Sequence, residues 1–296
     1  MLIVALCMAH YNWKAGRSDL RGAARVGVYC AIMSLISWFF NAHHVAADAE
    51  QGLIENALSK AAFLCLEYWL IYLALEPWVR RYWPQTIITW SRVLAGKWRD
   101  PLVGRDLLFG TLLGIAYALL VGVYEYANLR IGAPILGEIT LSQLNGMRFF
   151  AGRISGLLFS EVSGALLFLL TLLLVRVFLK KQWLVALVWV LGWVGVRFMR
   201  ANFFDSDMRM FTVTIFWLLL FTILVFIMLR LGFFALVVAV FVLDAMIGSF
   251  LTTDFTAWYG QSSLAIMMLI GGMALGGFRL SLGARPLFSP AALEKT

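Results

Sequence analysis

The stretch from Ser155 to Arg176 reads SGLLFSEVSGALLFLLTLLLVR, with Glu161 as its one acidic residue. A helix needs about 20 mainly apolar residues to cross a bilayer, because each residue adds about 1.5 Å and the hydrocarbon core is about 30 Å thick. Similar apolar stretches occur before and after this one in the chain. The first of these, residues 1–13, is short for a full crossing of the bilayer. Helices are predicted at 1–13, 26–47, 57–78, 107–127, 155–176, 182–199, 211–229, 232–252 and 261–280.

The composition of the whole chain agrees with these stretches. Of its 296 residues 62% are hydrophobic and 14% are charged, and the mean hydropathy is +0.87. Soluble domains carry about 25% charged residues. The sequence therefore predicts an all-α, polytopic transmembrane helical bundle of about nine helices. No linker rich in Ser, Gly or Pro divides the chain, so 1–296 is expected to form one integral membrane domain without an appended soluble enzyme.

The net charge of +8 comes from 24 Lys and Arg against 16 Asp and Glu. The cations lie in short clusters beside apolar runs, as in membrane proteins that face an anionic leaflet, so nucleic acid is not expected as a partner. With loops assigned to alternating sides, 17 of the 24 cations share one side. Cytoplasmic loops are enriched in Lys and Arg, which predicts an outer N-terminus and a cytoplasmic C-terminus. The cation-rich connections are 14–25, 79–106, 176–181, position 230 and the C-terminal end.

The cytoplasmic connection 79–106 is expected to contain a short amphipathic helix on the inner leaflet. Pro84 suits the first turn of a helix, and apolar residues including Trp90 follow it, with cations between them. The alternative is a loop packed on the helix ends. Ion pairs, including an exchange between Arg99, Asp100, Arg105 and Asp106, are expected to fix this segment as a platform that attracts anionic lipid. The platform residues are Glu76, Arg80, Arg81, Arg92, Lys97, Arg99, Asp100, Arg105 and Asp106, in which Glu76 and Arg80 are one helical turn apart.

Three acidic residues fall inside predicted spans: Glu67, Glu161 and Asp244. An ionisable group at the centre of a span costs about 2.5–3.5 kcal/mol on insertion scales unless it is paired or hydrated. One hypothesis is a path for protons or cations. The other, which is favoured for three scattered acids, is that each forms a hydrogen bond with a neighbouring helix or reaches towards a helix end.

Other chemistry finds little support in the sequence. His43 and His44 precede Asp48 and Glu50, but adjacent histidines point about 100° apart on a helix and no established zinc spacing is present. The three cysteines stand alone in apolar stretches. The sequence contains no G-x-S-x-G motif of a nucleophilic serine, no P-loop and no dinucleotide-binding fingerprint after a strand. The sequence therefore predicts no catalytic residue, no metal site and no cofactor.

Three GxxxG pairs predict close helix packing, within the bundle or against another subunit. They are Gly110 with Gly114, Gly152 with Gly156, and Gly272 with Gly276.

Two stretches carry a resemblance to a known family. The first reads LEPWVRRYWP at 75–84 and ITWSRVLAGKWRDPLVGRD at 88–106; the second reads LTTDFTAWY at 251–259, followed by GFR at 277–279 and SLGARPLF at 281–288. The chain resembles the multi-spanning membrane region C-terminal to the kinase domain in bacterial, especially acidobacterial, eukaryotic-like serine/threonine protein kinases. The resemblance covers most of the chain and implies a bacterial inner membrane. The Gly-rich loop, catalytic loop and metal-binding motif of kinases are absent from the sequence, so kinase activity is not implied.

The sequence thus favours a non-enzymatic integral membrane protein. It would be a sensor-like module, or an accessory or scaffold subunit that packs against other membrane proteins. The alternative is a secondary transporter or channel that uses Glu67, Glu161 and Asp244. A membrane-embedded enzyme acting on lipid ranks third.

Overall fold

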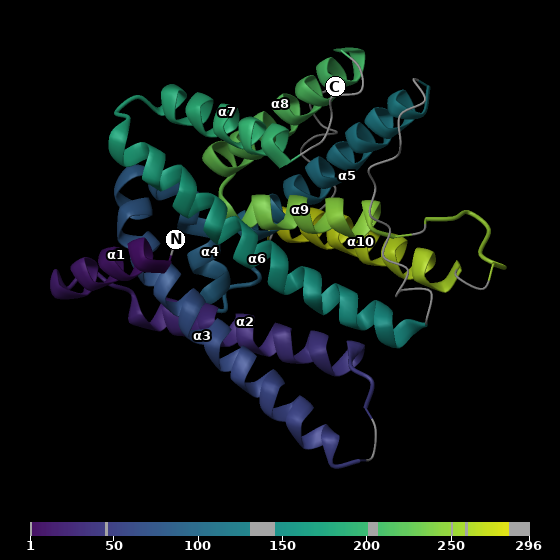
Figure 1. The fold of residues 1–296 in the computed structure, drawn as a ribbon, viewed down its shortest axis with the longest axis horizontal. Coiled ribbons are helices and arrows are strands. Elements are labelled where there is room, and N and C mark those ends of the chain that lie inside the picture. The colour runs from purple at the N-terminus through teal and green to yellow at the C-terminus, as the bar shows by residue number, and fades with distance from the viewer. Residues whose placement is uncertain are drawn as a thin grey trace, which may run out of the picture.

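The computed structural model describes residues 2–44, 47–130, 146–200, 207–249, 251–257 and 260–283, and its regular structure is entirely helical (Figure 1). Each predicted apolar segment forms a helix, which confirms the all-α polytopic bundle. The helices are α1 (Leu2–Lys14), α2 (Leu20–Asn41), α3 (Ala49–Tyr82), α4 (Pro84–Leu94), α5 (Pro101–Arg130), α6 (Met147–Phe178), α7 (Gln182–Arg200), α8 (Asp207–Arg230), α9 (Phe233–Ile247) and α10 (Gly260–Ser281).

Among the described residues, seven helices are long and apolar enough to cross a membrane, namely α2, α3, α5, α6, α7, α8 and α10. Two further apolar helices, α1 and α9, are shorter than a membrane crossing requires. α1 has 13 residues, and α9 has 15 residues because the chain turns at Gly248 before the predicted end at 252. A 15-residue helix rises about 22 Å, less than the hydrocarbon thickness of about 30 Å.

α9 is the central helix of the molecule. It passes through the middle of the ribbon and contacts α4, α5, α6 and α8 (Figure 1). Buried side chains come from all round it, which explains why its sequence is apolar without a polar face. The apolar run that resembles a span is therefore an internal core helix packed between longer ones.

Two of the three GxxxG pairs bring helices together. Built on the backbone, a Cβ atom at Gly110 would lie 2.8 Å from the carbonyl oxygen of Ala235, and one at Gly114 would lie 2.6 Å from that of Ala239. α5 therefore touches the backbone of α9 at two successive turns. Gly152 and Gly156 face the side chains of Asn41 and Ser37 on α2 in the same manner. The third pair, Gly272 and Gly276 on α10, has no described neighbour within 4 Å of such a Cβ.

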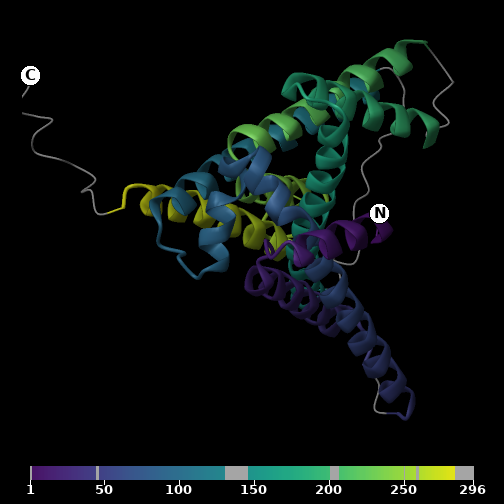
Figure 2. The same cartoon turned by 90° about the vertical axis from the view of Figure 1, so that its left-hand side faces the viewer.

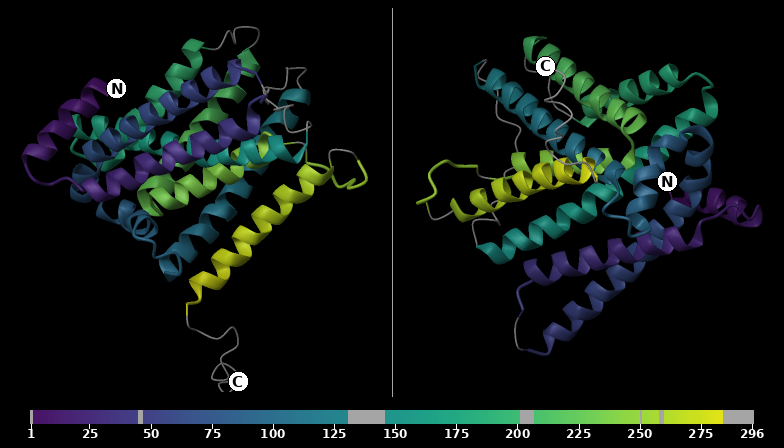
Figure 3. Two further views of the ribbon diagram at one scale, coloured as in Figure 1. Left: turned by 90° about the horizontal axis from the view of Figure 1, so that it is seen from below. Right: turned by 180° about the vertical axis from the view of Figure 1, so that it is seen from behind.

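The outer helices surround this centre unevenly. α2 and α3 pack against each other, and the start of α3 projects away from the other helices (Figure 2). α10 packs chiefly on α5 and lies at the edge of the molecule (Figure 3). Exposed apolar side chains in these two regions include Phe63 and Leu66 on α3 and Met268 and Leu275 on α10.

Two of the cation-rich connections, those between α1 and α2 and between α6 and α7, lie on the left of the bundle in Figure 1. Arg25 before the middle of α2 donates a 2.7 Å hydrogen bond to the carbonyl oxygen of Leu94, and the Arg176 guanidinium lies 5.3 Å from the ring centre of Tyr82. These two contacts join α2 and α6 to the connection that contains α4. Arg285 and Lys295 lie outside the described residues, as do Trp258, Tyr259 and positions 284–288 of the second resembling stretch.

The predicted amphipathic helix of the 79–106 connection is α4, but its apolar face does not lie on a leaflet. Ile87, Trp90 and Val93 are buried against the bundle, and the Trp90 ring centre lies 4.8 Å from that of Phe233 at the start of α9. Gly232, with φ near 110°, lets the turn before α9 approach the backbone of Thr86. The ends of the connection also differ from the prediction, because α3 continues to Tyr82 and α5 begins at Pro101.

Candidate functional site

Two of the three predicted intramembrane acids meet inside the bundle. The carboxyl groups of Glu161 on α6 and Asp244 on α9 are joined by a hydrogen bond. Glu161 also accepts a 2.8 Å hydrogen bond from the hydroxyl of Ser160, and its side chain is buried. Two carboxyl groups can form a hydrogen bond with each other only when one of them carries a proton, and any charge left on such a pair is stabilised by a nearby cation.

The Arg153 guanidinium compensates that charge. It lies two helical turns before Glu161 on α6 and donates a 2.7 Å hydrogen bond to the backbone carbonyl oxygen of Asp244. Its positive charge interacts with both acidic side chains. Arg153, Glu161 and Asp244 therefore form a buried cluster in which one cation faces two carboxyl groups, and a weakly polar interior tolerates such groups best when their charges are compensated.

Sequence reasoning missed Arg153. The predicted span began at 155, which placed this residue among the cations of the outer loops. The helix begins instead at Met147, so Arg153 lies inside it. The available signal was the helical spacing between a cation and an acid at the border of one apolar segment.

A cavity of about 520 Å³ adjoins this cluster. Glu161 lies in its wall. The other lining residues are mostly apolar and come from α2, α4, α5, α6, α9 and α10, with Trp98 from the loop between α4 and α5. Tyr29 of α2 lies at the wall and donates a 2.8 Å hydrogen bond to the Leu158 carbonyl oxygen. Because one carboxyl group faces many apolar side chains, the cavity suits hydrocarbon better than a chain of water molecules.

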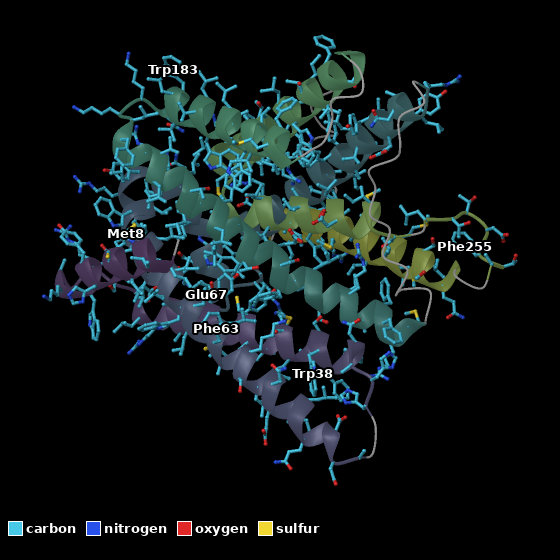
Figure 4. The ribbon with its side chains drawn as sticks, in the orientation of Figure 1. Met8, Trp38, Phe63, Glu67, Trp183 and Phe255 are labelled. Carbon is cyan, nitrogen blue, oxygen red and sulfur yellow. The ribbon has the colours of Figure 1, made fainter. Side chains whose placement is uncertain are left out.

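The third acid, Glu67, does not belong to this cluster. It lies half-buried near the middle of α3, on the same side as Phe63 one turn earlier (Figure 4). Phe63 and Leu66 are exposed, with 57% and 66% of their surfaces accessible. No described residue donates a hydrogen bond to the Glu67 carboxyl group. α3 thus presents an acid within an otherwise apolar outer face.

The platform residues form three ion pairs. Glu76 pairs with Arg80 on α3, Arg92 of α4 with Asp100 at 2.5 Å, and Arg105 with the buried Asp106 at 2.8 Å. The predicted exchange between Arg99, Asp100, Arg105 and Asp106 is therefore wrong in part, because Asp100 pairs with Arg92. Of the remaining cations, Lys97 and Arg99 are exposed, and Arg81 lies 5.8 Å from the Tyr82 ring centre.

Asp100 has a second structural role. Its Oδ1 accepts a 2.9 Å hydrogen bond from the Leu102 backbone N–H at the start of α5. That hydrogen bond and the Arg92 guanidinium hold the pKa of Asp100 below its ordinary value. The loop between α4 and α5 is thereby fixed to both helices.

The histidines at the opposite end of the bundle do not assemble a metal site. His44 Nδ1 lies 2.6 Å from Glu50 Oε1, and this hydrogen bond raises the pKa of the imidazole. Within the described part of the chain, no three His, Cys, Asp or Glu side chains are grouped so that they could hold a metal ion.

Comparison with family models, with curated proteins and with solved structures finds no match for this chain. The fold and the site define an integral membrane protein with a multi-pass helical bundle.

Proposed function

We propose that the protein is a non-enzymatic accessory subunit of a bacterial inner-membrane complex, and that it packs against a partner through the outer face of α3. The observation that carries the proposal is Glu67, half-buried on an exposed apolar face within a span. The partner would be a transmembrane helix that carries a hydrogen-bond donor, such as Lys, Arg, Asn or Gln.

The energetics favour such a partner over lipid. Phe63, Leu66, Glu67 and Leu70 follow one another at helical spacing of three and four residues, so they share a face. A carboxylate placed among hydrocarbon chains costs about 2.5–3.5 kcal/mol. A donor from a partner helix removes much of this cost, whereas lipid tails offer no hydrogen bond.

The acids of the bundle centre support the same role. Glu161 and Asp244 are paired with each other and compensated by Arg153, so they need no transported ion to satisfy them. The resemblance to the membrane region of bacterial kinases supports a module that assembles with, or reports to, other proteins. The cation-rich end, which includes α4, would face the cytoplasm and its anionic lipids.

The α3 interface can be tested by site-specific cross-linking in the native membrane. A photo-reactive amino acid at Leu66 is expected to give a discrete protein adduct. Glu67→Leu should lower its yield about fivefold, because an interhelical hydrogen bond is worth about 1 kcal/mol. Glu67→Gln should retain most of the adduct, since an amide still accepts and donates hydrogen bonds.

Two matched controls make this experiment specific. The same reactive residue at Leu119, an equally exposed position on α5, should give lipid adducts alone. Glu55→Gln, at the projecting end of α3, should leave the adduct from Leu66 unchanged. An adduct pattern at Leu66 that matches Leu119, or one that Glu67→Leu does not alter, would rule out the interface.

A second candidate function is proton-coupled transport, which one observation favours. Glu161 interacts with Asp244 and also lies in the wall of the cavity, so its carboxyl group could exchange a proton with a molecule bound there. Carboxyl pairs of this kind occur in proton relays of transporters.

Transport makes a different prediction from assembly. In vesicles that contain the purified full chain, we expect no proton flux above that of empty vesicles, with or without Glu161→Gln. A reproducible flux in the unmodified protein that Glu161→Gln or Asp244→Asn abolishes would replace the accessory subunit by a transporter. Lys60→Gln, an exposed change on α3, is the control for nonspecific leakage.

A further inference from the structure

The cavity beside Glu161 has the size of a ligand site. Its volume of about 520 Å³ falls within the range of about 300–1,000 Å³ that is usual for small-molecule pockets. Leu158 of α6, Phe234 and Phe241 of α9, and Met273 of α10 supply much of its wall. These side chains offer a long hydrocarbon surface with few polar groups.

The mouth of the cavity is basic. Arg25 and Trp98 form part of its rim, and both side chains are exposed. Trp98 also borders a second hollow of about 440 Å³ made by residues 96–100, which includes the exposed cations Lys97 and Arg99. The acid of this loop, Asp100, is occupied by Arg92. An anion at the rim would therefore meet positive charge from two elements of the chain.

A buried donor lies just inside the rim. Trp90 lines the cavity and is 94% buried, yet its Nε1–H has no hydrogen-bond acceptor among the described residues. Buried polar groups are nearly always paired with protein or with a bound molecule. An acceptor oxygen on a ligand in the cavity would satisfy this donor.

The order of the cation, the N–H donor and the apolar side chains from the rim inward indicates the kind of ligand that fits the cavity. Arg25 bonds to the carbonyl oxygen of Leu94, so the rim cation lies one turn of α4 beyond Trp90. Phe234 and Phe241 then follow along α9 over seven residues, about 10 Å deeper. A matching molecule has an anionic group, an acceptor oxygen close to it and a hydrocarbon chain, in that order.

We propose that this cavity is a binding site for an anionic phospholipid of the surrounding bilayer. Its phosphate lies at Arg25, an ester carbonyl oxygen accepts the hydrogen bond of Trp90, and one acyl chain fills the space between α6, α9 and α10. This site goes beyond the attraction of lipid to a basic surface, because it encloses a chain. It does not depend on the α3 interface of the proposed accessory role.

Native mass spectrometry of the full-length protein in mild detergent can test the site. Phosphatidylglycerol and phosphatidylcholine with identical acyl chains serve as probes. We expect phosphatidylglycerol to be retained as a single tightly bound copy, and phosphatidylcholine about tenfold less. Arg25→Gln should reduce phosphatidylglycerol retention about tenfold, since a charge-assisted hydrogen bond is lost. Val237→Trp, which fills the cavity, should reduce retention of both lipids.

Each arm has a control at a comparable position. Arg21→Gln lies one turn earlier on α2 and outside the cavity lining, and Leu119→Trp adds the same ring to an exposed face of α5. Neither should change retention. Trp90→Phe keeps an aromatic side chain and removes the N–H donor, so it tests the site if Val237→Trp fails to fold.

Three results would overturn the proposal. The first is equal retention of the two lipids, and the second is retention that Arg25→Gln and Trp90→Phe leave unchanged. The third is equal loss in Arg21→Gln and Arg25→Gln, which would indicate a general basic surface. Loss of the Leu66 cross-link with intact lipid retention would instead count against the accessory role alone.

Discussion

Replacing Gly114 with leucine is expected to separate α5 from α9 and to lower the free energy of unfolding by about 3 kcal/mol. A Cβ at this position would lie 2.6 Å from the carbonyl oxygen of Ala239 and 2.7 Å from the Cβ of Val242. Both contacts involve the backbone or the base of a branched side chain, so neither can move without shifting a helix. Unfolding in increasing concentrations of a denaturing detergent measures the change.

Gly122 supplies the matched control for this prediction. It lies two turns further along α5, and a Cβ there has no described neighbour within 4 Å. Gly122→Leu should therefore leave stability unchanged or raise it by several tenths of a kcal/mol, because leucine favours helices over glycine. Equal losses from Gly114→Leu and Gly122→Leu would contradict the close contact between α5 and α9.

Removing the charge of Arg153 is expected to lower the free energy of unfolding by about as much as Gly114→Leu does. Arg153→Met leaves the hydrogen-bonded pair of Glu161 and Asp244 without its compensating cation and removes the 2.7 Å hydrogen bond to the Asp244 carbonyl oxygen. Breaking one partner out of a buried charge cluster usually costs about 3–5 kcal/mol. We expect a loss of about 3 kcal/mol in the same detergent assay.

A double-mutant cycle separates charge from packing in this cluster. Asp244→Asn alone should cost about 1 kcal/mol or less, because the amide keeps hydrogen-bonding groups in place. Combined with Arg153→Met, it should lose clearly less than the sum of the two, since no pair of acids then remains to be compensated. Additive losses would show that Arg153 acts by packing alone. Lys60→Met, an exposed cation on α3, should have no measurable effect.

These two expectations bear on function as well as on stability. The packing of α5 against α9 and the cluster of α6 with α9 both fix α9, and α9 forms one wall of the proposed lipid site. A variant that loosens α9 is therefore expected to lose lipid retention along with stability. Variants at the rim, such as Arg25→Gln, should lose retention while their stability is unchanged.

The positions of the helices could be predicted from the sequence. An apolar run of the right length forms a helix wherever it lies in a membrane, because its backbone groups must be satisfied within the segment. This reason holds for α5, α6 and α8, because each observed helix contains the whole of its predicted range. It also explains why α9 was predicted as a span, since a core helix buried on all sides has the same apolar composition.

The candidate site could be predicted in part. Glu67, Glu161 and Asp244 were identifiable because an acid within an apolar run is rare and costly. Their different surroundings were not identifiable. Glu161 and Asp244 are neutralised inside the bundle, whereas Glu67 lies on an outer face, and no property of the flanking residues distinguishes these two situations.

Local composition is enough to assign the class of protein and to find its apolar helices, because both depend only on the residues within each segment. The tertiary structure alone decided which polar groups meet. Arg153 and Asp244 are 91 residues apart in the chain, and Trp90 reaches the cavity because α4 turns its apolar face inward onto α9. Contacts between such distant residues depend on how the helices cross. The crossing is set by close approaches between two helices, such as that of Gly114 to Ala239, and cannot be read from either helix alone.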